Sequence, residues 1–394
     1  MLSYEFLFDL ALILISTKLF GLITKKVHMP QVVGALVAGV VLGPAVLNVL
    51  SETEFIQQLA ELGVIVLMFT AGLETDIKQL KRTGKASFII AVLGVIIPLV
   101  GGFFIASIFN KGADINTVLQ NIFIGIILTA TSVSITVETL KEMGKLSTRA
   151  GNAILGAAII DDILGIVALT ITTSLADPSI NVLLVLGKIV LFFVVSGIGG
   201  YLFHWAFNKL DERYQRDMRR FVILAFVFCL LLSFMAEEFF GVADITGAFI
   251  AGLVISDSNR TKYLNSRFET LSYMLLSPIF FASIGIKVEL TTMSKTILIF
   301  TVLLLLVAIL SKIIGCGIGA KICRYSNREA IQIGTGMVSR GEVALIVANK
   351  GIAMGLMLPE FLAPIVIVVV ITTIITPILL KIAFRDKSKN TIRI

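Results

Sequence analysis

Five ionisable residues lie inside long apolar stretches of the sequence, where a charge needs a partner. Asp161 and Asp162 occupy the centre of Gly156-Ala-Ala-Ile-Ile-Asp-Asp-Ile-Leu-Gly165. Lys312 lies in an apolar run at 310–315, and Arg340 and Glu342 lie in another at 337–343. A charge in such surroundings costs about 3 kcal/mol or more unless an opposite charge or a water-filled cavity neutralises it. Two carboxylates and an ammonium group therefore predict a buried ion pair and a site for a cation or a proton.

The two neighbouring aspartates are expected to divide this chemistry between them. Adjacent residues of a helix point about 100° apart, so Asp161 and Asp162 cannot share one partner symmetrically. We expect one carboxylate to pair with Lys312 and the other to face a cavity, where a cation or a proton neutralises it. A purely structural ion pair is the alternative role for Lys312.

Hydroxyl side chains supply further oxygen ligands in the run Thr129-Ala-Thr-Ser-Val-Ser134. Thr and Ser compete for backbone hydrogen bonds and help to open a helix. Unwound carbonyls, hydroxyls and one carboxylate would form a hard oxygen site suited to a small alkali cation. Hydroxyls that bond back to their own helix are the alternative. A second apolar stretch is interrupted by Ser339-Arg-Gly341, and paired broken helices indicate a transporter binding site.

Two pairs of ionisable residues, Arg340 with Glu342 and Glu237 with Glu238, admit two interpretations each. Arg340 and Glu342 do not face each other on a regular helix, so each finds another partner or the helix is unwound there. We favour a structural charge network for this pair over a direct role in transport. Glu237 and Glu238 close an apolar run and are expected at the outer interface, with an entrance funnel for cations as the alternative.

The composition places these residues in a membrane. The 394 residues are 57% hydrophobic and only 15% charged, whereas soluble proteins carry about 25% charged residues. At about 20 residues per spanning helix, the chain holds roughly a dozen spans. We find no nucleophile–base pair or metal-ligand cluster in the sequence, so an enzyme is not expected, and no cofactor or nucleic-acid partner is indicated.

Apolar runs between polar breaks predict thirteen transmembrane helices. Their approximate ranges are 4–24, 31–50, 58–76, 86–109, 118–140, 149–176, 181–207, 220–240, 242–257, 270–286, 296–320, 329–350 and 358–384. With these spans, 25 of the 33 Lys and Arg residues fall in loops on one side and four on the other. The positive-inside rule then predicts an external N-terminus and a cytoplasmic C-terminus.

An internal repeat appears at an offset of 213 residues. Gly34-Ala-Leu-Val-Ala-Gly-Val-Val-Leu42 matches Gly247-Ala-Phe-Ile-Ala-Gly-Leu-Val-Ile255, and Gly72 matches Gly285 at the same offset. The second predicted span corresponds to the ninth, and an odd offset means that the two copies cross the membrane in opposite directions. The sequence thus predicts an all-α polytopic membrane protein with two inverted six-helix repeats, the architecture of alternating-access transporters.

These motifs resemble a known family. Gly151 to Thr173 with its aspartate pair, Ala130 to Thr136, Ser311-Lys-Ile-Ile-Gly315 and Ser339-Arg-Gly-Glu342 are similar to bacterial sodium/proton antiporters of the NapA type. This type belongs to the second family of monovalent cation/proton antiporters, which includes the KefC-like potassium exporters. The last predicted span leaves roughly ten residues, so we expect no cytosolic nucleotide domain of the KefC kind.

The resemblance implies a homodimer with the NhaA/NapA-like fold, including discontinuous crossing helices. Residues 1–80 and 220–290 would form the dimerisation domain, 81–177 and 291–394 the moving ion-carrying core, and 178–219 a linker helix. Asp162 matches the cation-binding carboxylate, and Asp161 matches the carboxylate that pairs with Lys312. Thr131 and Ser132 match the broken-helix crossing and complete the expected Na⁺ ligands with Asp162.

The expected function is exchange of Na⁺, and of Li⁺ as a second substrate, for protons across a bacterial inner membrane. Proton and cation would compete for the same carboxylates, and binding of either would neutralise the core enough for it to cross. The double aspartate is associated by resemblance with electrogenic exchange. The alternatives are an exporter of the same fold that prefers K⁺ or is unselective, a Na⁺-coupled symporter of an organic anion, and a gated channel.

Overall fold

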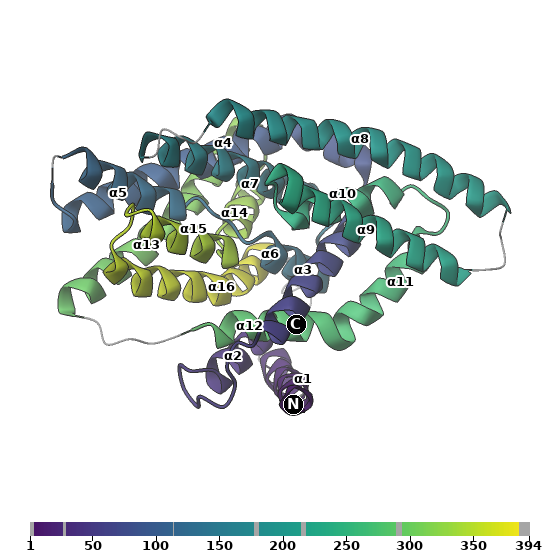
Figure 1. Cartoon of the computed structure of the whole chain (residues 1–394), viewed down its shortest axis with the longest axis horizontal. Coiled ribbons are helices and arrows are strands. Elements are labelled where there is room, and N and C mark those ends of the chain that lie inside the picture. The colour runs from purple at the N-terminus through teal and green to yellow at the C-terminus, as the bar shows by residue number, and fades with distance from the viewer. Residues whose placement is uncertain are drawn as a thin grey trace, which may run out of the picture.

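The computed structural model describes residues 4–26, 29–112, 114–176, 181–213, 218–288 and 294–385, without the side chains of Gln79, Ala176 and Glu342. All regular elements in these ranges are helices (Figure 1), which confirms the predicted all-α class. The elements are α1 (Glu5–Lys26), α2 (Gln31–Leu42), α3 (Glu54–Glu74), α4 (Ile77–Phe109), α5 (Ile115–Ile127), α6 (Val133–Glu142), α7 (Arg149–Ala176), α8 (Val182–Arg213), α9 (Met218–Phe240), α10 (Asp244–Ile255), α11 (Thr261–Leu271), the π-helical turn η1 (Ser272–Leu276), α12 (Ser277–Ile286), α13 (Lys295–Ile322), α14 (Asn327–Gly336), α15 (Glu342–Ala353), the 3-10 turn η2 (Pro359–Phe361) and α16 (Leu362–Phe384).

Nine helical segments of the described chain are long and apolar enough to cross a membrane. The shorter apolar helices α2, α5, α10 and α15 have only 10–17 residues. At 1.5 Å per residue, a helix of 12 residues extends about 18 Å, less than the roughly 30 Å of a hydrocarbon core. The protein is therefore a multi-pass membrane protein, and the count of thirteen crossings stays a prediction.

Two of the predicted spans consist of two helices each. The range 118–140 is interrupted between Ile127 and Val133, where α5 ends and α6 begins, and 329–350 is interrupted between Gly336 and Glu342. The segment Thr261–Ile286 contains the π-helical turn η1 in its middle. Extended backbone with β-region dihedrals at Ser132 and Gly341 ends the helical hydrogen-bond pattern at both breaks.

Ion pairs between distant segments group the helix ends at two opposite faces of the bundle. Lys141 pairs with Glu74 at 3.2 Å, whereas Lys287 pairs with Glu52 at 2.9 Å. Because α3 begins just after Glu52 and ends at Glu74, these two contacts mark its two ends. Lys141 lies at the end of Glu74, and Lys25 and Lys381 act electrostatically on Glu142 beside it, so we call this end the basic face. The other end is the opposite face.

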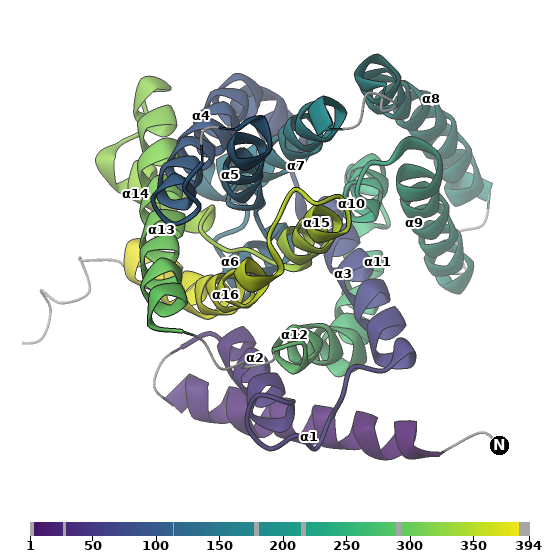
Figure 2. The same ribbon diagram turned by 60° about the vertical axis from the view of Figure 1, so that its left-hand side comes forward.

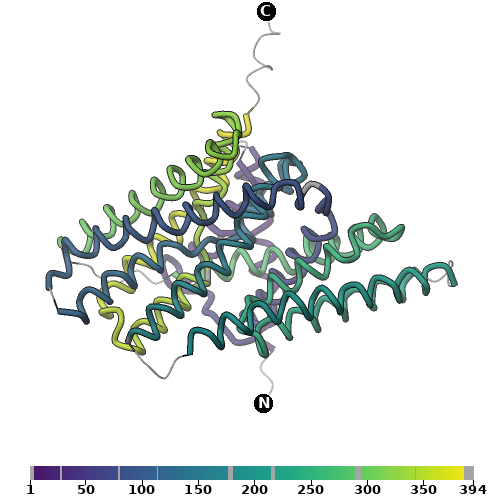
Figure 3. The backbone as a smooth tube through the Cα atoms, turned by 90° about the horizontal axis from the view of Figure 1, so that it is seen from above, coloured from purple at the N-terminus to yellow at the C-terminus, as the bar shows by residue number. Residues whose placement is uncertain are grey.

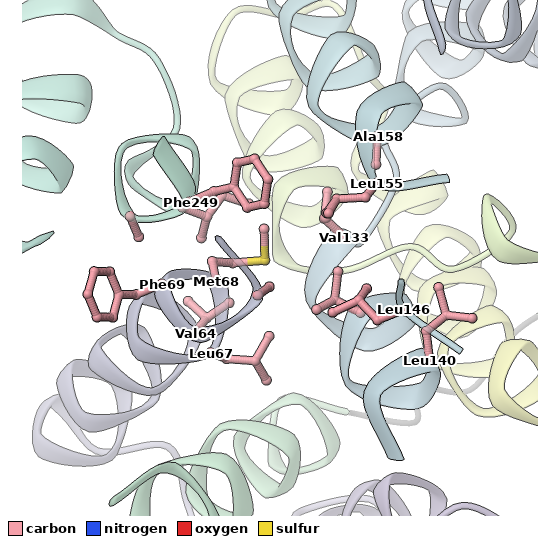
Figure 4. Close-up of a cluster of buried hydrophobic side chains, with 14 of the residues drawn as sticks. Val64, Leu67, Met68, Phe69, Val133, Leu140, Leu146, Leu155, Ala158 and Phe249 are labelled. Atoms are coloured by element: carbon pink, nitrogen blue, oxygen red, sulfur yellow. The ribbon is translucent and has the colours of Figure 1, made fainter. Parts of the chain in front are cut away.

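The bundle has a densely packed interior built from several helices. Figure 2 shows α4, α5, α13, α15 and α16 gathered in one region, with α8 and α9 farthest from it and α1, α2 and α12 below. The tube in Figure 3 shows α4, drawn in blue, alongside α13, drawn in green, and these two helices are in extensive contact. One apolar cluster joins α3 and α10 to α6 and α7, with Met68 and Phe249 on one side and Val133 and Leu155 on the other (Figure 4).

Glycines allow the closest helix approaches, and they form two matching pairs. Gly39 of α2 and Gly285 of α12 lie where these helices touch, and Gly72 of α3 and Gly252 of α10 lie where those touch. A methyl group on Gly252 would lie 2.2 Å from the carbonyl oxygen of Phe69, which is a severe steric clash. Small residues at such positions let helix backbones approach each other in a membrane.

The substitution Gly252→Ala should therefore destabilise the protein. Overpacking at a backbone contact costs about 1–3 kcal/mol, more than the roughly 1 kcal/mol that Ala gains over Gly in a helix. Thermal unfolding in detergent measures the effect. Gly199→Ala in α8 is the matched control, because no atom lies within 4 Å of a methyl group there. The packing argument would be contradicted if Gly252→Ala, like the control, unfolded at the wild-type temperature or above it.

Candidate cation-binding site

A buried ion pair between α7 and α13 forms the centre of the site. Lys312 Nζ lies 2.9 Å from Asp161 Oδ1 and 3.0 Å from Oδ2. Only 2% of the Asp161 surface and none of the Lys312 surface is exposed. Gly94 of α4 packs against the pair, since a methyl group there would lie 3.7 Å from Asp161 Oδ1 and 2.6 Å from Cys316 Sγ. The absence of a side chain at Gly94 lets α4 cover both charges.

Asp162 follows Asp161 on α7 but lies in a different environment. It is partly exposed, whereas Asp161 is buried. The two carboxylates therefore differ in access to water and ions, as neighbouring positions of a helix require. Lys312 neutralises the charge of Asp161, and Asp162 keeps part of its surface exposed.

The two interrupted spans bind each other through their unwound backbones. The Ser132 N–H donates to Ser339 O at 2.8 Å, and the Ser339 hydroxyl donates to Ser132 O at 2.8 Å. Thr136 Oγ1 donates to Gly336 O at 2.7 Å. A methyl group on Gly341 would lie 2.8 Å from Ser132 Oγ. Each break thus supplies hydrogen-bond partners that the other break has lost from its own helix.

The hydroxyl groups at the crossing have different partners. Thr129 Oγ1 donates to Ile126 O at 2.7 Å, so this hydroxyl bonds back to its own helix. Ser132 Oγ lies 3.2 Å from Ser134 Oγ. Thr131 Oγ1 is fully buried beside the Asp161 carboxylate and makes no hydrogen bond of good geometry to the described residues. A buried hydroxyl without a partner costs free energy, so Thr131 is a candidate ligand for a bound ion.

Arg340 stabilises the crossing by binding backbone carbonyls. Its guanidinium donates to Val338 O at 2.8 Å, to Leu128 O at 2.8 Å and to Ala308 O at 2.9 Å. The first two acceptors follow the C-terminal ends of α14 and α5, where helix dipoles concentrate negative charge. Glu342 is the first residue of α15, and the placement of its side chain lies outside what the structure describes. The bonds shown for Arg340 serve the backbone of the crossing.

Two cavities lie between the helices on either side of this crossing. The larger, about 780 Å³, opens towards the opposite face between α3 and α12 on one side and α15 and α16 on the other. The smaller, about 480 Å³, lies towards the basic face and is lined by α1, α2, α6 and the turn η1. Neither Glu237 nor Glu238 lines either of these two cavities.

Some residues near the site were not singled out from the sequence. Glu138 of α6 lines the smaller cavity one helical turn beyond Ser134. A carboxylate two residues before the predicted end of the span 118–140 was the available signal. Gly94 could not be singled out in the same way, because the chain contains 32 glycines and the residue type alone does not show which of them packs against a charged side chain.

Comparison with known proteins decides the family. A family profile described as "Sodium/hydrogen exchanger, transmembrane" matches residues 11–385. The chain belongs to the sodium/hydrogen exchanger family. It is 39% identical over 392 residues to the Na(+)/H(+)-K(+) antiporter GerN of Bacillus cereus, with 98% of each chain covered. It is 36% identical to the Na(+)/H(+) antiporter of Enterococcus hirae, covering 96% of this chain and 97% of the relative.

The fold is also that of a solved antiporter structure. The sodium proton antiporter MjNhaP1 from Methanocaldococcus jannaschii at pH 8 matches with a TM-score of 0.67, covering 95% of this chain and 98% of that one. At 20% identity this likeness shows the fold alone. The relatives in this family are cation/proton antiporters, which are transporters rather than enzymes, as the sequence predicts.

Replacing Lys312 by Met should destabilise the protein strongly. A buried ion pair that loses one partner leaves an uncompensated charge, at a cost of about 3–5 kcal/mol. The double variant Asp161→Asn/Lys312→Met carries no such charge and should recover most of the loss. Thermal unfolding in detergent compares the three proteins. Single and double variants that unfold at the same temperature would show that the pair is not energetically coupled.

Replacing Arg340 should weaken the crossing in proportion to the donors that are lost. Arg340→Met leaves three buried carbonyls without their donor, each worth about 1 kcal/mol or more, whereas Arg340→Lys keeps the charge and part of the donor set. We expect the unfolding temperature to fall in the order wild type, Arg340→Lys, Arg340→Met. Equal stability of all three proteins would contradict this role.

Proposed function

We propose that this protein exchanges Na⁺ or Li⁺ for protons by alternating access, as an antiporter of the NapA type. The observation that carries the proposal is the partly exposed Asp162 next to a neutralised Asp161–Lys312 pair, at the crossing of two interrupted helices. This is the arrangement in which a carboxylate binds a small cation or a proton and then crosses with it.

The cation ligands in this proposal are Asp162, the Thr131 hydroxyl and Ser132. The buried Thr131 hydroxyl oxygen lies beside Asp161 without a hydrogen bond of good geometry, and hydroxyl oxygens suit alkali cations as ligands. A proton on Asp162 removes the negative charge that a cation needs, so the two substrates exclude each other. Without a bound ion, the negative charge of Asp162 is costly to move through apolar surroundings, and this cost favours exchange over leak.

The proposal divides the chain into a dimerisation domain and a moving core within thirteen crossings. Two inverted repeats are supported by the glycine contacts. At the offset of 213 residues, Gly39 corresponds to Gly252 and Gly72 corresponds to Gly285. In the repeat, α2 corresponds to α10 and α3 corresponds to α12. The contact of α2 with α12 therefore corresponds to the contact of α10 with α3. A pseudo-two-fold axis between the copies generates this pattern, because it maps each contact onto the other.

We further propose that the basic face is cytoplasmic, that the membrane is a bacterial inner membrane, and that the protein acts as a homodimer. The excess of Lys and Arg on one side supports this orientation. Electrogenic exchange is part of the proposal, because two carboxylates opposite one ammonium group can release more than one proton for each Na⁺ bound. Exposed apolar side chains such as Leu183 and Tyr201 on α8 are compatible with lipid or a second copy.

A second candidate is an exporter that prefers K⁺ or takes both ions. The name of the GerN relative includes K⁺ as well as Na⁺, and oxygen ligands alone do not fix the size of the ion. The two candidates share the same site and differ only in the cation that it prefers.

Transport in proteoliposomes with a pH gradient and a clamped membrane potential tests both candidates. Addition of Na⁺ or Li⁺ should collapse the gradient, and Asp162→Asn should abolish this collapse because the amide cannot bind the cation. Asp257→Asn, an exposed residue between α10 and α11, is the matched control and should keep full activity. Collapse with K⁺ alone would select the exporter, and undiminished exchange in Asp162→Asn would refute the assigned site.

A further inference from the structure

The last two residues of α6 connect it to two helices of the proposed dimerisation domain. Lys141 and Glu142 lie at the basic face, at the end of the half-helix that begins at the crossing. Lys141 reaches α3, and Glu142 reaches the N-terminus of α2. Figure 1 shows α6 beside α3, and α6 is in contact with both helices. These contacts therefore join the proposed core to the proposed dimerisation domain.

Glu142 caps a helix that lacks a cap of its own. The residue before α2 is Pro30, whose side chain makes no capping hydrogen bond. The N–H of Gln31 donates instead to both carboxylate oxygens of Glu142, at 2.8 and 2.9 Å. The first N–H groups of a helix have no partner within the helix, and the helix dipole favours an anion there. A carboxylate from α6 thus supplies what the local sequence of α2 does not.

Lys141 makes the second connection. Its Nζ lies 3.2 Å from Glu74 Oε1 and 3.3 Å from Thr70 Oγ1, both on α3. Glu74 also accepts a hydrogen bond from Asn265 Nδ2 of α11 at 2.9 Å. The Glu74 carboxylate is therefore held by α11 as well as by its own helix, α3. If α6 moved, Lys141 would leave and Glu74 would keep its bond to Asn265.

At the basic face, Lys141 and Glu142 line the smaller cavity of about 480 Å³ and also contact α3 and α2. The opposite face has the larger cavity. There the 780 Å³ cavity separates α3 and α12 from α15 and α16. Polar contacts thus join the two proposed units beside the smaller cavity on one side, and the larger cavity separates them on the other. An alternating-access cycle needs the reverse arrangement as its second state, and in that state the contacts of Lys141 and Glu142 are broken.

We propose that Lys141 and Glu142 form a releasable latch, the α6 latch, which holds the cytoplasmic side closed in the outward-open state. The inference rests on the proposed function, because it assumes that core and dimerisation domain move relative to each other. Both contacts are partly exposed, and exposed polar contacts are weak individually. Weak contacts suit a latch that must open in every cycle, whereas the buried Asp161–Lys312 pair lies inside the core and moves with it.

Cysteine accessibility on both sides tests the latch. The background is Cys323→Ser, since Cys229 and Cys316 are buried. Ala35→Cys reports on the smaller cavity and Ala363→Cys on the larger one, each labelled with a membrane-impermeant maleimide in lipid nanodiscs. Glu142→Gln and Lys141→Met should each raise the labelling rate at position 35 and lower it at position 363, by about threefold, because the population shifts to the inward-open state.

The reciprocal change separates a latch from local loosening. Faster labelling at position 35 without slower labelling at position 363 would overturn the proposal, and so would unchanged rates at both positions. The charge exchange Lys141→Glu/Glu74→Lys should return both rates towards the wild-type values, and failure to do so would refute the Lys141–Glu74 contact as part of the latch. Lys145→Met, in the loop after α6, is the matched control and should leave both rates unchanged.

This experiment is independent of transport. Labelling is measured without an ion gradient, so a protein that exchanges no cation still reports the state of the latch. The latch variants should give the same shifts in an Asp162→Asn background. If the protein exchanges no cation but the latch variants still shift both labelling rates in opposite directions, the proposed function is refuted and the latch stands. If the protein exchanges Na⁺ for protons but the labelling rates do not shift in this way, the latch is refuted and the proposed function stands.

Discussion

The structure depends on the neutralisation of polar groups inside an apolar bundle. Asp161 and Lys312 cancel each other within 3.0 Å, and this pair allows a second carboxylate, Asp162, to stand beside it without a net charge of minus two. The interrupted helices supply oxygens for the proposed ion, but each interruption leaves backbone carbonyls without their helical donors. Arg340 donates to Val338 and Leu128 at the two breaks, and also to Ala308 of the continuous helix α13. Ion pair, breaks and guanidinium therefore form one interdependent arrangement.

Small residues make this arrangement possible because they determine how closely the helices approach. Gly94 lets α4 cover the ion pair, and Gly341 lets the two breaks meet at Ser132. Gly39, Gly72 and their counterparts serve the other part of the bundle, where they bring helix backbones into contact. Packing in a membrane has little hydrophobic driving force between helices, so close contact and hydrogen bonds have to provide the stability.

Much of this could be predicted because buried charges and helix breaks leave clear marks in a sequence. The aspartate pair and Lys312 stand out against apolar neighbours, and the runs around Thr131 and Ser339 indicated the two interruptions. The carbonyl partners of Arg340 could not be predicted, since backbone acceptors have no residue identity. The contacts of Lys141 and Glu142 could not be predicted either, because their partners are 67 or more residues away along the chain. The short helices α2 and α10 likewise leave the number of crossings undecided by length.

In the proposed mechanism, the distribution of strong and weak contacts follows from what a moving core requires. Contacts within the core have to survive the movement, and the Asp161–Lys312 pair and the bonds of Arg340 are buried and hydrogen-bonded. Contacts between the proposed core and the proposed dimerisation domain have to break and re-form, and Lys141 and Glu142 make theirs where water can replace the partner. A buried interdomain ion pair would be costly to open, because each separated charge would lack compensation. Placing the strong pair inside one unit and the weak contacts between units keeps the two end states close in free energy, as exchange in both directions requires.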